Sequence, residues 1–298
     1  MRAVFELRDY YMICDMIKVI KVSKSTYFYN VAKYNQKDKD FELKADIIRI
    51  FNEHKARYGY RRVRLQLLNE GTSVSQNKVK RIMKELGLKA KVTAKKYKSY
   101  KGTVGEKFNN LLLDKVCDPN KLTYTFKRNF TTTNVNQKWA TDVSQFTTQY
   151  GKIFLSALID ICSRDIVAYT ISTSPTFEHV YSMMVNALKK YKNVNDLILH
   201  SDQGWQYQMF RFTSLLKSKN IKQSMSRKGN CLDNSHIENF FGIMKKEMFY
   251  GYEKNFTSLE HCIQEMKSYI KYYNEKRIIE RLGGVSPKSY RQKINDKL

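Results

Sequence analysis

The chain has few acidic residues, no patterned cysteines and no long apolar run, and each shortage excludes a class of protein. Its five cysteines are scattered, without a Cys-x-x-Cys pair or cysteine–histidine zinc spacing, so we expect reduced thiols rather than disulfides or a zinc finger. No stretch approaches the roughly 20 apolar residues of a membrane span, and the N-terminus lacks a signal core. We therefore expect a cytoplasmic protein with no membrane partner.

The shortage of acids leaves a large positive charge, because 28 Asp+Glu stand against 54 Lys+Arg, a net charge of +26. On a chain with 42% hydrophobic residues, this indicates a packed protein with a polyanionic partner, nucleic acid first among the candidates. The charge is uneven: residues 1–100 hold 24 basic and 10 acidic residues, whereas residues 136–202 hold six of each. A basic front and a neutral middle favour a DNA-binding region followed by a region of catalytic carboxylates.

Two helical pairs in the basic front predict DNA binding. In the second pair, Ser75 is a candidate N-cap, and apolar residues then recur at helical spacing up to Gly87. A helix over 61–69 precedes it, which is helix-turn-helix spacing with the second helix as the reader. A weaker copy spans 9–20 and a helix after Ser23. The expected DNA contacts here are Lys78, Lys80, Arg81, Lys84, Arg61 and Arg62. The alternative is a solvated basic face on a small helical bundle.

The middle of the chain predicts a mixed sheet. Strands are expected over 139–148, 151–161, 165–172, 196–200 and 221–224, and helices over 176–191, 206–219, 233–250 and 250–273. Three consecutive strands followed by alternating helix and strand indicate an α/β fold, a mixed sheet flanked by helices. We expect a helix-turn-helix-like segment over 1–40, a helix-turn-helix domain over 41–90, a basic linker over 91–133, a catalytic core over 134–250 and a helical extension over 251–298.

Three carboxylates stand out on this scaffold. Asp142 falls inside the first strand, Asp202 just past the fourth, and Glu238 one turn into a helix at the border of its apolar stripe. Phosphodiesters resist nucleophiles, and two Mg²⁺ ions about 3.5 to 4 Å apart, held by carboxylate oxygens, can activate the attacking oxygen and stabilise the leaving one. Because the chain has 28 acids, the trio alone is weak evidence.

The residues around the trio are more specific. They form three motifs: Trp139–Asp142, His200–Gly204 with Gln206 and Tyr207, and Ser224–Asn234 running into Glu238–Phe241. These resemble the catalytic OrfB-type subunit of the insertion-sequence-three family of bacterial transposases. The 35 residues between Asp202 and Glu238, and Lys245 seven beyond, match the wider superfamily of DDE transposases and retroviral integrases. The segment Tyr58–Arg62 and a C-terminal segment around Ser286 and Tyr290 extend the resemblance over most of the chain.

This resemblance implies an RNase H-like fold and a magnesium-dependent DDE enzyme, with Mn²⁺ able to replace Mg²⁺. It implies cleavage at the ends of an insertion sequence, followed by attack of a 3′-OH on target DNA, at the bacterial nucleoid. Double-stranded DNA is the expected partner, and a homo-oligomer is expected because two ends must be held together. The family often joins this subunit to an upstream OrfA-type segment, so we expect this chain to be part of the working enzyme. Gln203 and Trp205 depart from the family pattern, which puts the DNA contacts beside Asp202 in doubt.

Several nearby residues have competing interpretations. Lys245, Arg227, Lys228 and Asn230 are expected to contact DNA. Asp160 is the strongest rival carboxylate, and we expect it to pair with Arg164 across a turn. Asp233 is expected to cap the helix that carries Glu238. The rival functions are a metal-dependent nuclease without strand transfer, which would need no end-recognition domain, and an inactive DNA-binding remnant, which would tolerate the loss of an acid.

Overall fold

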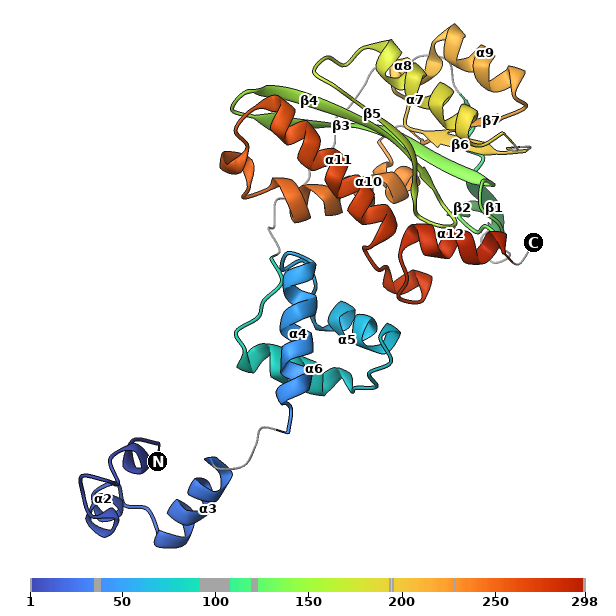
Figure 1. The fold of residues 1–298 in the computed structure, drawn as a ribbon. Helices are drawn as coiled ribbons and strands as arrows, with labels where there is room; N and C mark the ends of the chain where they lie inside the picture. The colour runs from blue at the N-terminus through green and yellow to red at the C-terminus, as the bar shows by residue number, and fades with distance from the viewer. Residues whose placement is uncertain are drawn as a thin grey trace.

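The computed structural model describes residues 2–34, 39–91, 108–118, 123–192, 194, 196–227 and 229–296. Helices make up the described N-terminal part, strands and helices alternate in the middle, and helices return at the end (Figure 1). No helix in the described ranges is both long and apolar enough to cross a membrane. The α-helical front and the α/β middle expected from the sequence are confirmed.

The N-terminal helices form two groups. They are α1 (Arg2–Glu6), α2 (Ile13–Val19), α3 (Lys24–Tyr34), α4 (Phe41–Glu53), α5 (Tyr60–Asn69) and α6 (Gln76–Glu85). The first three surround a small core of Val4, Ile17 and Tyr27, whereas α4, α5 and α6 share a larger one. The Ser75 hydroxyl accepts a hydrogen bond from the Lys78 N–H, so the predicted N-cap of α6 is confirmed.

The central sheet has five strands in the order β5-β4-β3-β6-β7. They are β3 (Lys138–Thr148), β4 (Gly151–Asp160), β5 (Ile166–Ser172), β6 (Ile198–Ser201) and β7 (Lys222–Met225). β3, β4 and β5 pair antiparallel, whereas β6 and β7 run parallel to β3. Three antiparallel strands followed by two parallel ones reached through helices are the arrangement of an RNase H-like fold.

Helices cover both faces of this sheet. On one face lie α7 (Phe177–Lys190), α8 (Trp205–Gln208) and α9 (Phe210–Ser218), and on the other α10 (Ser235–Met244) and α11 (Leu259–Glu275) (Figure 1). In β4, Ala157 and Ile159 belong to the core beneath α10 and α11, and Leu158 between them belongs to the core beneath α7 and α9. Because successive strand residues face opposite ways, a strand covered on both sides is apolar throughout.

Two predicted helices have different limits in the structure. The helix expected over 206–219 is broken at Met209, whose backbone is extended between α8 and α9. The last long helix begins at Leu259 rather than at Tyr250, with the Ser258 hydroxyl as its N-cap. Gly251, with a φ of 80°, turns the chain after the preceding helix, and a short 3-10 turn, η3 (Glu253–Asn255), intervenes.

Other short elements complete the fold: the 3-10 turn η1 (Cys231–Asn234), the π-helical turn η2 (Lys245–Phe249), the 3-10 turn η4 (Glu280–Leu282) and α12 (Pro287–Asn295). Sequence reasoning missed one further feature, a two-stranded antiparallel ribbon of β1 (Leu113–Asp118) and β2 (Thr123–Arg128). The ribbon lies where we expected a basic linker. Residues 92–107 and 119–122 of that linker, with most of its lysine-rich run, lie outside the described residues.

The helix-turn-helix region docks directly on the C-terminal part of the chain. The fully buried Tyr58 hydroxyl donates to the Lys276 carbonyl at 3.3 Å and accepts from the Ile278 N–H at 2.9 Å. Arg62 Nη1 lies 3.4 Å from Glu247 Oε1. Arg62, expected to contact DNA, therefore turns inward. Arg277, which is 2% exposed, pairs with the same carboxylate at 2.8 Å.

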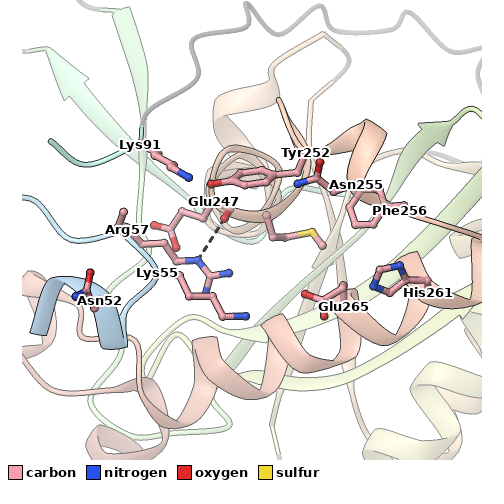
Figure 2. A pocket seen from close by; sticks show the side chains of 12 residues that line it. Asn52, Lys55, Arg57, Lys91, Glu247, Tyr252, Asn255, Phe256, His261 and Glu265 are labelled. Carbon is pink, nitrogen blue, oxygen red and sulfur yellow. Dashed lines mark hydrogen bonds between the residues drawn. The ribbon is translucent and has the colours of Figure 1, made fainter. Parts of the chain in front are cut away.

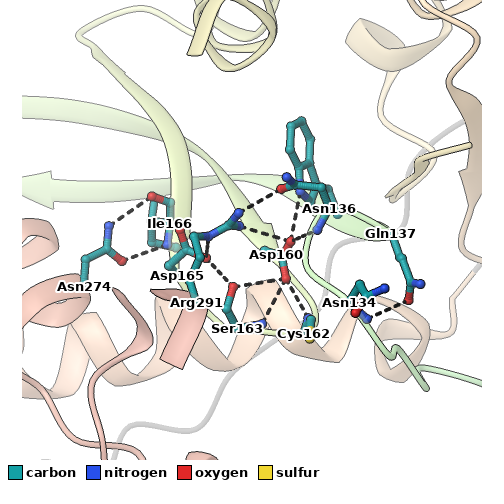
Figure 3. Close-up of polar contacts among 11 residues, drawn as sticks. Asn134, Asn136, Gln137, Asp160, Cys162, Ser163, Asp165, Ile166, Asn274 and Arg291 are labelled. Atoms are coloured by element: carbon teal, nitrogen blue, oxygen red, sulfur yellow. Dashed lines mark hydrogen bonds and ion pairs between the residues drawn. The ribbon is translucent and has the colours of Figure 1, made fainter. Parts of the chain in front are cut away.

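A second buried network ties α12 to the sheet (Figure 3). Asp160 does not form the expected ion pair with Arg164. It accepts from the N–H groups of Cys162 and Ser163, and its other oxygen lies 3.1 Å from Arg291 Nη2, an ion pair without hydrogen-bond geometry. Arg291 Nε also donates to Asp165 at 2.9 Å. Asp160 is therefore a structural acid rather than a rival site residue.

Arg291→Met should destabilise the protein strongly, because it would leave Asp160 and Asp165 buried without their cation. Breaking such a buried pair costs about 3–5 kcal/mol. Lys288→Met is a matched control on the same helix, since Lys288 pairs with Glu275 on the surface, where an ion pair contributes about 0–1 kcal/mol. Urea unfolding of the two variants is the measurement, and equal midpoints would contradict the role assigned to Arg291.

Candidate active site

The pairing of β3 with β6 brings two of the predicted acids together. These strands are parallel, and Thr141 lies opposite Ser201 in the last pair of the ladder. The next residue along the chain is an aspartate in each case, Asp142 within β3 and Asp202 directly after the end of β6, and the two lie at the same level of the sheet. Both lie at the carboxyl end of the parallel ladder, the edge at which α/β sheets place their reactive groups.

Helix α10 brings the third acid to this edge. Its apolar residues Ile237, Phe240 and Phe241 are buried against the sheet, as their spacing predicts, and Glu238 lies beside them, partly exposed. Just before the helix, the Asn234 side-chain N–H donates to the Thr141 carbonyl at 3.1 Å. This bond fixes the start of α10 beside Asp142.

The three carboxylates perturb one another. Burial raises the pKa of Asp142 well above its usual range, and the charges of Asp202 and Glu238 raise it further. Burial also raises the pKa of Asp202, although the Gly204 N–H opposes the shift. Burial and the Asp202 charge raise the pKa of Glu238 to about 7. Such mutual repulsion is typical of sites that bind a cation or a proton.

An open cavity of about 440 Å³ adjoins the acids and is lined by Asp142, Glu238 and Lys245, among others. Lys245 is the first residue of the π-helical turn η2, and its Nζ lies 5.0 Å from the centroid of the Phe146 ring. Burial lowers the pKa of Lys245, and the Asp142 charge opposes that shift. The cavity therefore combines two carboxylates with a cation that could contact a phosphate.

Two nearby residues, Gly204 and His200, stabilise the chain on either side of Asp202. The Gly204 N–H donates to Asp202 Oδ1 at 2.9 Å, and a Cβ on residue 204 would lie 2.9 Å from that oxygen and 2.5 Å from Gln206 Nε2. Behind it, the two ring nitrogens of the fully buried His200 lie 2.8 Å from Ser224 Oγ and 3.0 Å from Ser226 Oγ. Burial lowers the pKa of His200 to about 4, so a neutral imidazole joins β6 to β7.

The donor set suits a hard divalent ion. Carboxylate oxygens are the ligands that Mg²⁺ prefers, and a bound cation would offset the burial and the charge repulsion that raise the pKa values of these acids. Within the described ranges, no three His, Cys, Asp or Glu side chains are already close enough together to hold one metal ion. The chemistry of the donors thus fits the ion, and the side chains would have to converge on it.

Tyr207 is a part of this site that sequence reasoning missed. It is fully buried, its hydroxyl lies 3.4 Å from Thr141 Oγ1, and burial with the charges of Asp142 and Asp202 raises its pKa well above the usual range. A neutral phenol therefore lies close to the two aspartates. Tyr207 belongs to the sequence motif that follows His200, but only the fold shows that it lies beside the aspartates.

The basic loop before α10 is organised around Asp233, which does not cap that helix as expected. Although burial opposes it, hydrogen bonds from Arg227 and Arg128 lower the pKa of Asp233 to about 2. The N-cap position is Asn234, which makes no side-chain cap bond. Arg227, an expected DNA contact, is thus partly committed to Asp233, Asn230 is exposed, and Lys228 lies outside the described residues.

The expected DNA contacts of α6 all lie on its exposed face: Lys78, Lys80, Arg81 and Lys84. Lys78 and Arg81 both pair with Asp40, at 2.8 and 2.7 Å. Arg61 at the start of α5 is also exposed, and Arg61 and Lys80 lie about the Tyr60 ring, at 6.0 and 5.8 Å from its centroid. The structure thus gathers these cations on one surface of the helix-turn-helix region, away from Asp142, Asp202 and Glu238.

A second cavity of about 420 Å³ lies where the end of α4 meets η2 and α11 (Figure 2). Its lining mixes Lys55, Arg57 and Lys91 with Glu247 and Glu265. The Arg57 guanidinium donates from Nε to the Glu247 carbonyl and lies 4.7 Å from the Tyr272 ring centroid. None of the predicted site residues that the structure describes lines this cavity, and its cationic wall is partly used to dock the helix-turn-helix region.

Comparison with protein families defines the class of the chain. Residues 132–231 and 238–294 match models described as an integrase core domain, and residues 37–97 match a model described as an HTH-like domain. With the sheet order and the carboxylate edge described above, these matches define a polynucleotidyl transferase of the integrase and transposase type, with an RNase H-like fold and a DNA-binding domain.

Individual relatives specify the family. The putative transposase InsK for insertion sequence element IS150 of Escherichia coli is 39% identical over 292 residues, which is 98% of this chain and 97% of the relative. Transposase InsF for insertion sequence IS3A of the same species is 30% identical over 252 residues, which is 83% of this chain and 81% of the relative. The chain belongs to the insertion-sequence-three family of DDE transposases, whose activity depends on divalent metal ions.

Among solved structures, the HTLV-2 integrase catalytic core domain in complex with magnesium is similar to part of the chain. It is 17% identical, covers 53% of this chain and 97% of its own, and has a TM-score of 0.44.

The raised pKa of Glu238 predicts how the metal-free protein responds to pH. The folded state holds this proton up to about pH 7, whereas the unfolded chain releases it near 4.5, so the free energy of unfolding falls as pH rises through that window. Glu238→Gln should therefore gain stability relative to wild type at about pH 8 but not at about pH 5. Allowing for screening at this partly exposed position, we expect about 1 kcal/mol.

Urea unfolding of wild type and Glu238→Gln at the two pH values, in buffer that contains a metal chelator, measures this difference in stability. A variant whose stability relative to wild type is the same at both pH values would contradict the electrostatic account of Glu238.

Proposed function

We propose that Asp142, Asp202 and Glu238 hold the divalent ions of this transposase, and that the ions are Mg²⁺, with Mn²⁺ able to replace it. The observation that supports this most is the β3–β6 register, which sets Asp142 and Asp202 side by side at the end of a parallel ladder. Two such ions would supply activation of the attacking oxygen and stabilisation of the leaving oxygen of a phosphodiester.

The chain's own residues would orient the DNA strand in this site. Lys245 lines the same cavity as Asp142 and Glu238, so its ammonium group can bind a phosphate beside the carboxylates. Asn234 holds the start of α10, and Gly204 leaves room for the Asp202 carboxylate. These three residues position the reacting strand or the acids and take no proton in the reaction.

The reaction that this arrangement supports best is cleavage at the ends of an insertion sequence followed by joining of the 3′-OH to target DNA. Helix α6 would read the element ends, with Lys78, Lys80, Arg81 and Lys84, and Arg61 of α5, facing the duplex. A nuclease that only hydrolyses DNA would need no such end-recognition domain. Because both ends must be held for joining, we propose a multimer on DNA, acting at the bacterial nucleoid, with or without an upstream OrfA-type subunit.

Glu238→Gln should abolish both cleavage and joining of a labelled duplex that carries the element's ends, with a loss of at least about 100-fold. The variant keeps the size of the side chain but removes a negatively charged ligand. Titration calorimetry with Mn²⁺ should show weaker ion binding. Glu260→Gln, on the exposed first turn of α11, is the matched control and should behave as wild type.

Each outcome of that experiment separates the candidate functions. Joined products that vanish in the variant support strand transfer at these acids, and hydrolysis without joining supports a nuclease. Equal activity of wild type and Glu238→Gln would rule out Glu238 as a metal ligand.

Lys80→Ala and Lys84→Ala should each weaken binding of the element ends several-fold and reduce the dependence of affinity on salt by about one counterion. These two lysines form no ion pair with an acid in the described part of the chain, so their charges are available to phosphates. Fluorescence anisotropy over a range of salt is the measurement. Lys152→Ala on the exposed turn end of β4 is the control, and an unchanged salt slope for both α6 variants would contradict DNA contact by this helix.

A further inference from the structure

The ribbon of β1 and β2 exposes two large aromatic side chains. It pairs with no third strand in the described chain, and the Tyr124 and Phe126 side chains are 58% and 54% exposed. An isolated two-stranded hairpin is at best marginally stable in water, and an exposed aromatic pair gives it no buried core. A ribbon of this kind is therefore suited to packing against a partner.

The two rings lie on one face of the ribbon. Tyr124, Phe126 and Arg128 alternate along β2, so their side chains point the same way, and Lys115 lies directly across from Phe126. Lys115 Nζ is 3.7 Å from the centroid of the Tyr124 ring, which is a cation–π contact. One face thus carries two stacking surfaces with an ammonium group beside them.

The base of the ribbon is fixed to the loop that leads into the catalytic helix. Arg128 Nε donates to Asp233 Oδ1 at 2.7 Å, and the Asn110 side-chain N–H donates to the other oxygen at 3.0 Å. Asp233 is followed by Asn234, which is bonded to the Thr141 carbonyl next to Asp142. A continuous set of contacts therefore connects the aromatic face to the carboxylates.

A second attachment runs along the edge of the sheet. The Met225 N–H donates to the Asn109 carbonyl at 3.3 Å, and the Leu111 N–H donates to Ser224 Oγ at 2.9 Å. The segment before β1 therefore lies beside the carboxyl end of β7, next to the end of β6 that Asp202 follows. The ribbon is held at this edge by both backbone and side-chain bonds.

We propose that the aromatic face of the ribbon binds unpaired bases of the DNA strand that enters the active site, with Tyr124 and Phe126 stacking on the bases and Lys115 near a phosphate. This inference rests on the proposed placement of the active site. Every base offers an aromatic face, so the contact would tolerate any sequence. DNA is favoured over a protein partner because it is the substrate, and because Lys115 lies across from Phe126 and against the Tyr124 ring, so the two rings do not join a wider apolar surface.

The test compares a forked duplex, with a short unpaired stretch at one end, with the matching blunt duplex. Affinities are measured by fluorescence anisotropy in a chelator, so no strand is cut and the result does not depend on the identity of the metal ligands. The double variant Tyr124→Ala/Phe126→Ala should bind the forked duplex about 10-fold or more weakly than wild type and the blunt duplex nearly as well. The fluorescence of a 2-aminopurine base placed in the unpaired stretch should be quenched when wild type binds and should not be quenched when the variant binds.

Two further variants control the experiment. Tyr124→Phe/Phe126→Tyr keeps both rings and should retain the affinity of wild type for the forked duplex. Tyr150→Ala removes an aromatic ring that is 45% exposed on the β3–β4 turn and should have no effect. Because both altered residues of the double variant are exposed, unchanged thermal unfolding should accompany its loss of binding.

The proposal is overturned if the double variant binds the forked duplex as wild type does, or loses equal affinity for both duplexes. It is also overturned if light scattering shows that the double variant loses self-association while its DNA affinity is unchanged, since the ribbon would then bind a second copy of the chain. Failure of the metal-ligand proposal would appear separately, as retained cleavage by Glu238→Gln.

Discussion

Electrostatic repulsion among Asp142, Asp202 and Glu238 is the constraint around which the catalytic core is arranged. Burial raises the pKa of all three, and neighbouring carboxylates raise those of Asp142 and Glu238 further, so the fold holds these acids at a cost in stability. The parallel β3–β6 ladder sets the two aspartates, and the Asn234 bond to the Thr141 carbonyl sets the helix of Glu238. A rigid sheet and a helix packed on it can sustain that repulsion, whereas a flexible loop would let the acids separate.

The buried acids Asp160, Asp165 and Asp233 differ from this trio because each pairs with arginine. Asp160 and Asp165 share Arg291, and Asp233 pairs with Arg128 and Arg227. Each of these carboxylates therefore has its charge compensated within the protein. An acid paired with arginine has no need of a metal ion, whereas the uncompensated trio gains stability from one. Side-chain pairing thus separates the structural acids from the proposed ligands.

Helix α10 also connects the proposed active site to the helix-turn-helix region. Its continuation, η2, carries both Lys245, which faces the acids, and Glu247, which pairs with Arg62 of the helix-turn-helix region and with Arg277. Burial alone would raise the pKa of Glu247, but these arginines lower it, so the carboxylate stays charged. One short helical segment therefore contacts both the cavity beside the proposed ligands and the helix-turn-helix region, so a displacement of either would shift the other.

Much of the local structure could be predicted from the sequence alone. The buried stripe of α10, the Ser75 cap of α6 and the strands of the sheet follow from side chains a few residues apart, whose relation is set by helical or strand geometry. The family was identified from motifs around Asp142, Asp202 and Glu238, and its membership is confirmed. Composition also indicated nucleic acid as the partner, because charge is a property of the whole chain.

Only the tertiary structure decided which distant groups meet. Asp160 pairs with Arg291 rather than with its neighbour Arg164, Asp233 holds the missed ribbon through Arg128, and Arg62 turns inward. In each case the partner lies far away in the sequence and is brought close by the order of strands and the docking of domains. The periodicity of a sequence shows only which residues share a face of one helix or one strand. It therefore cannot predict which arginine pairs with a given buried acid, because the tertiary fold alone brings the two together.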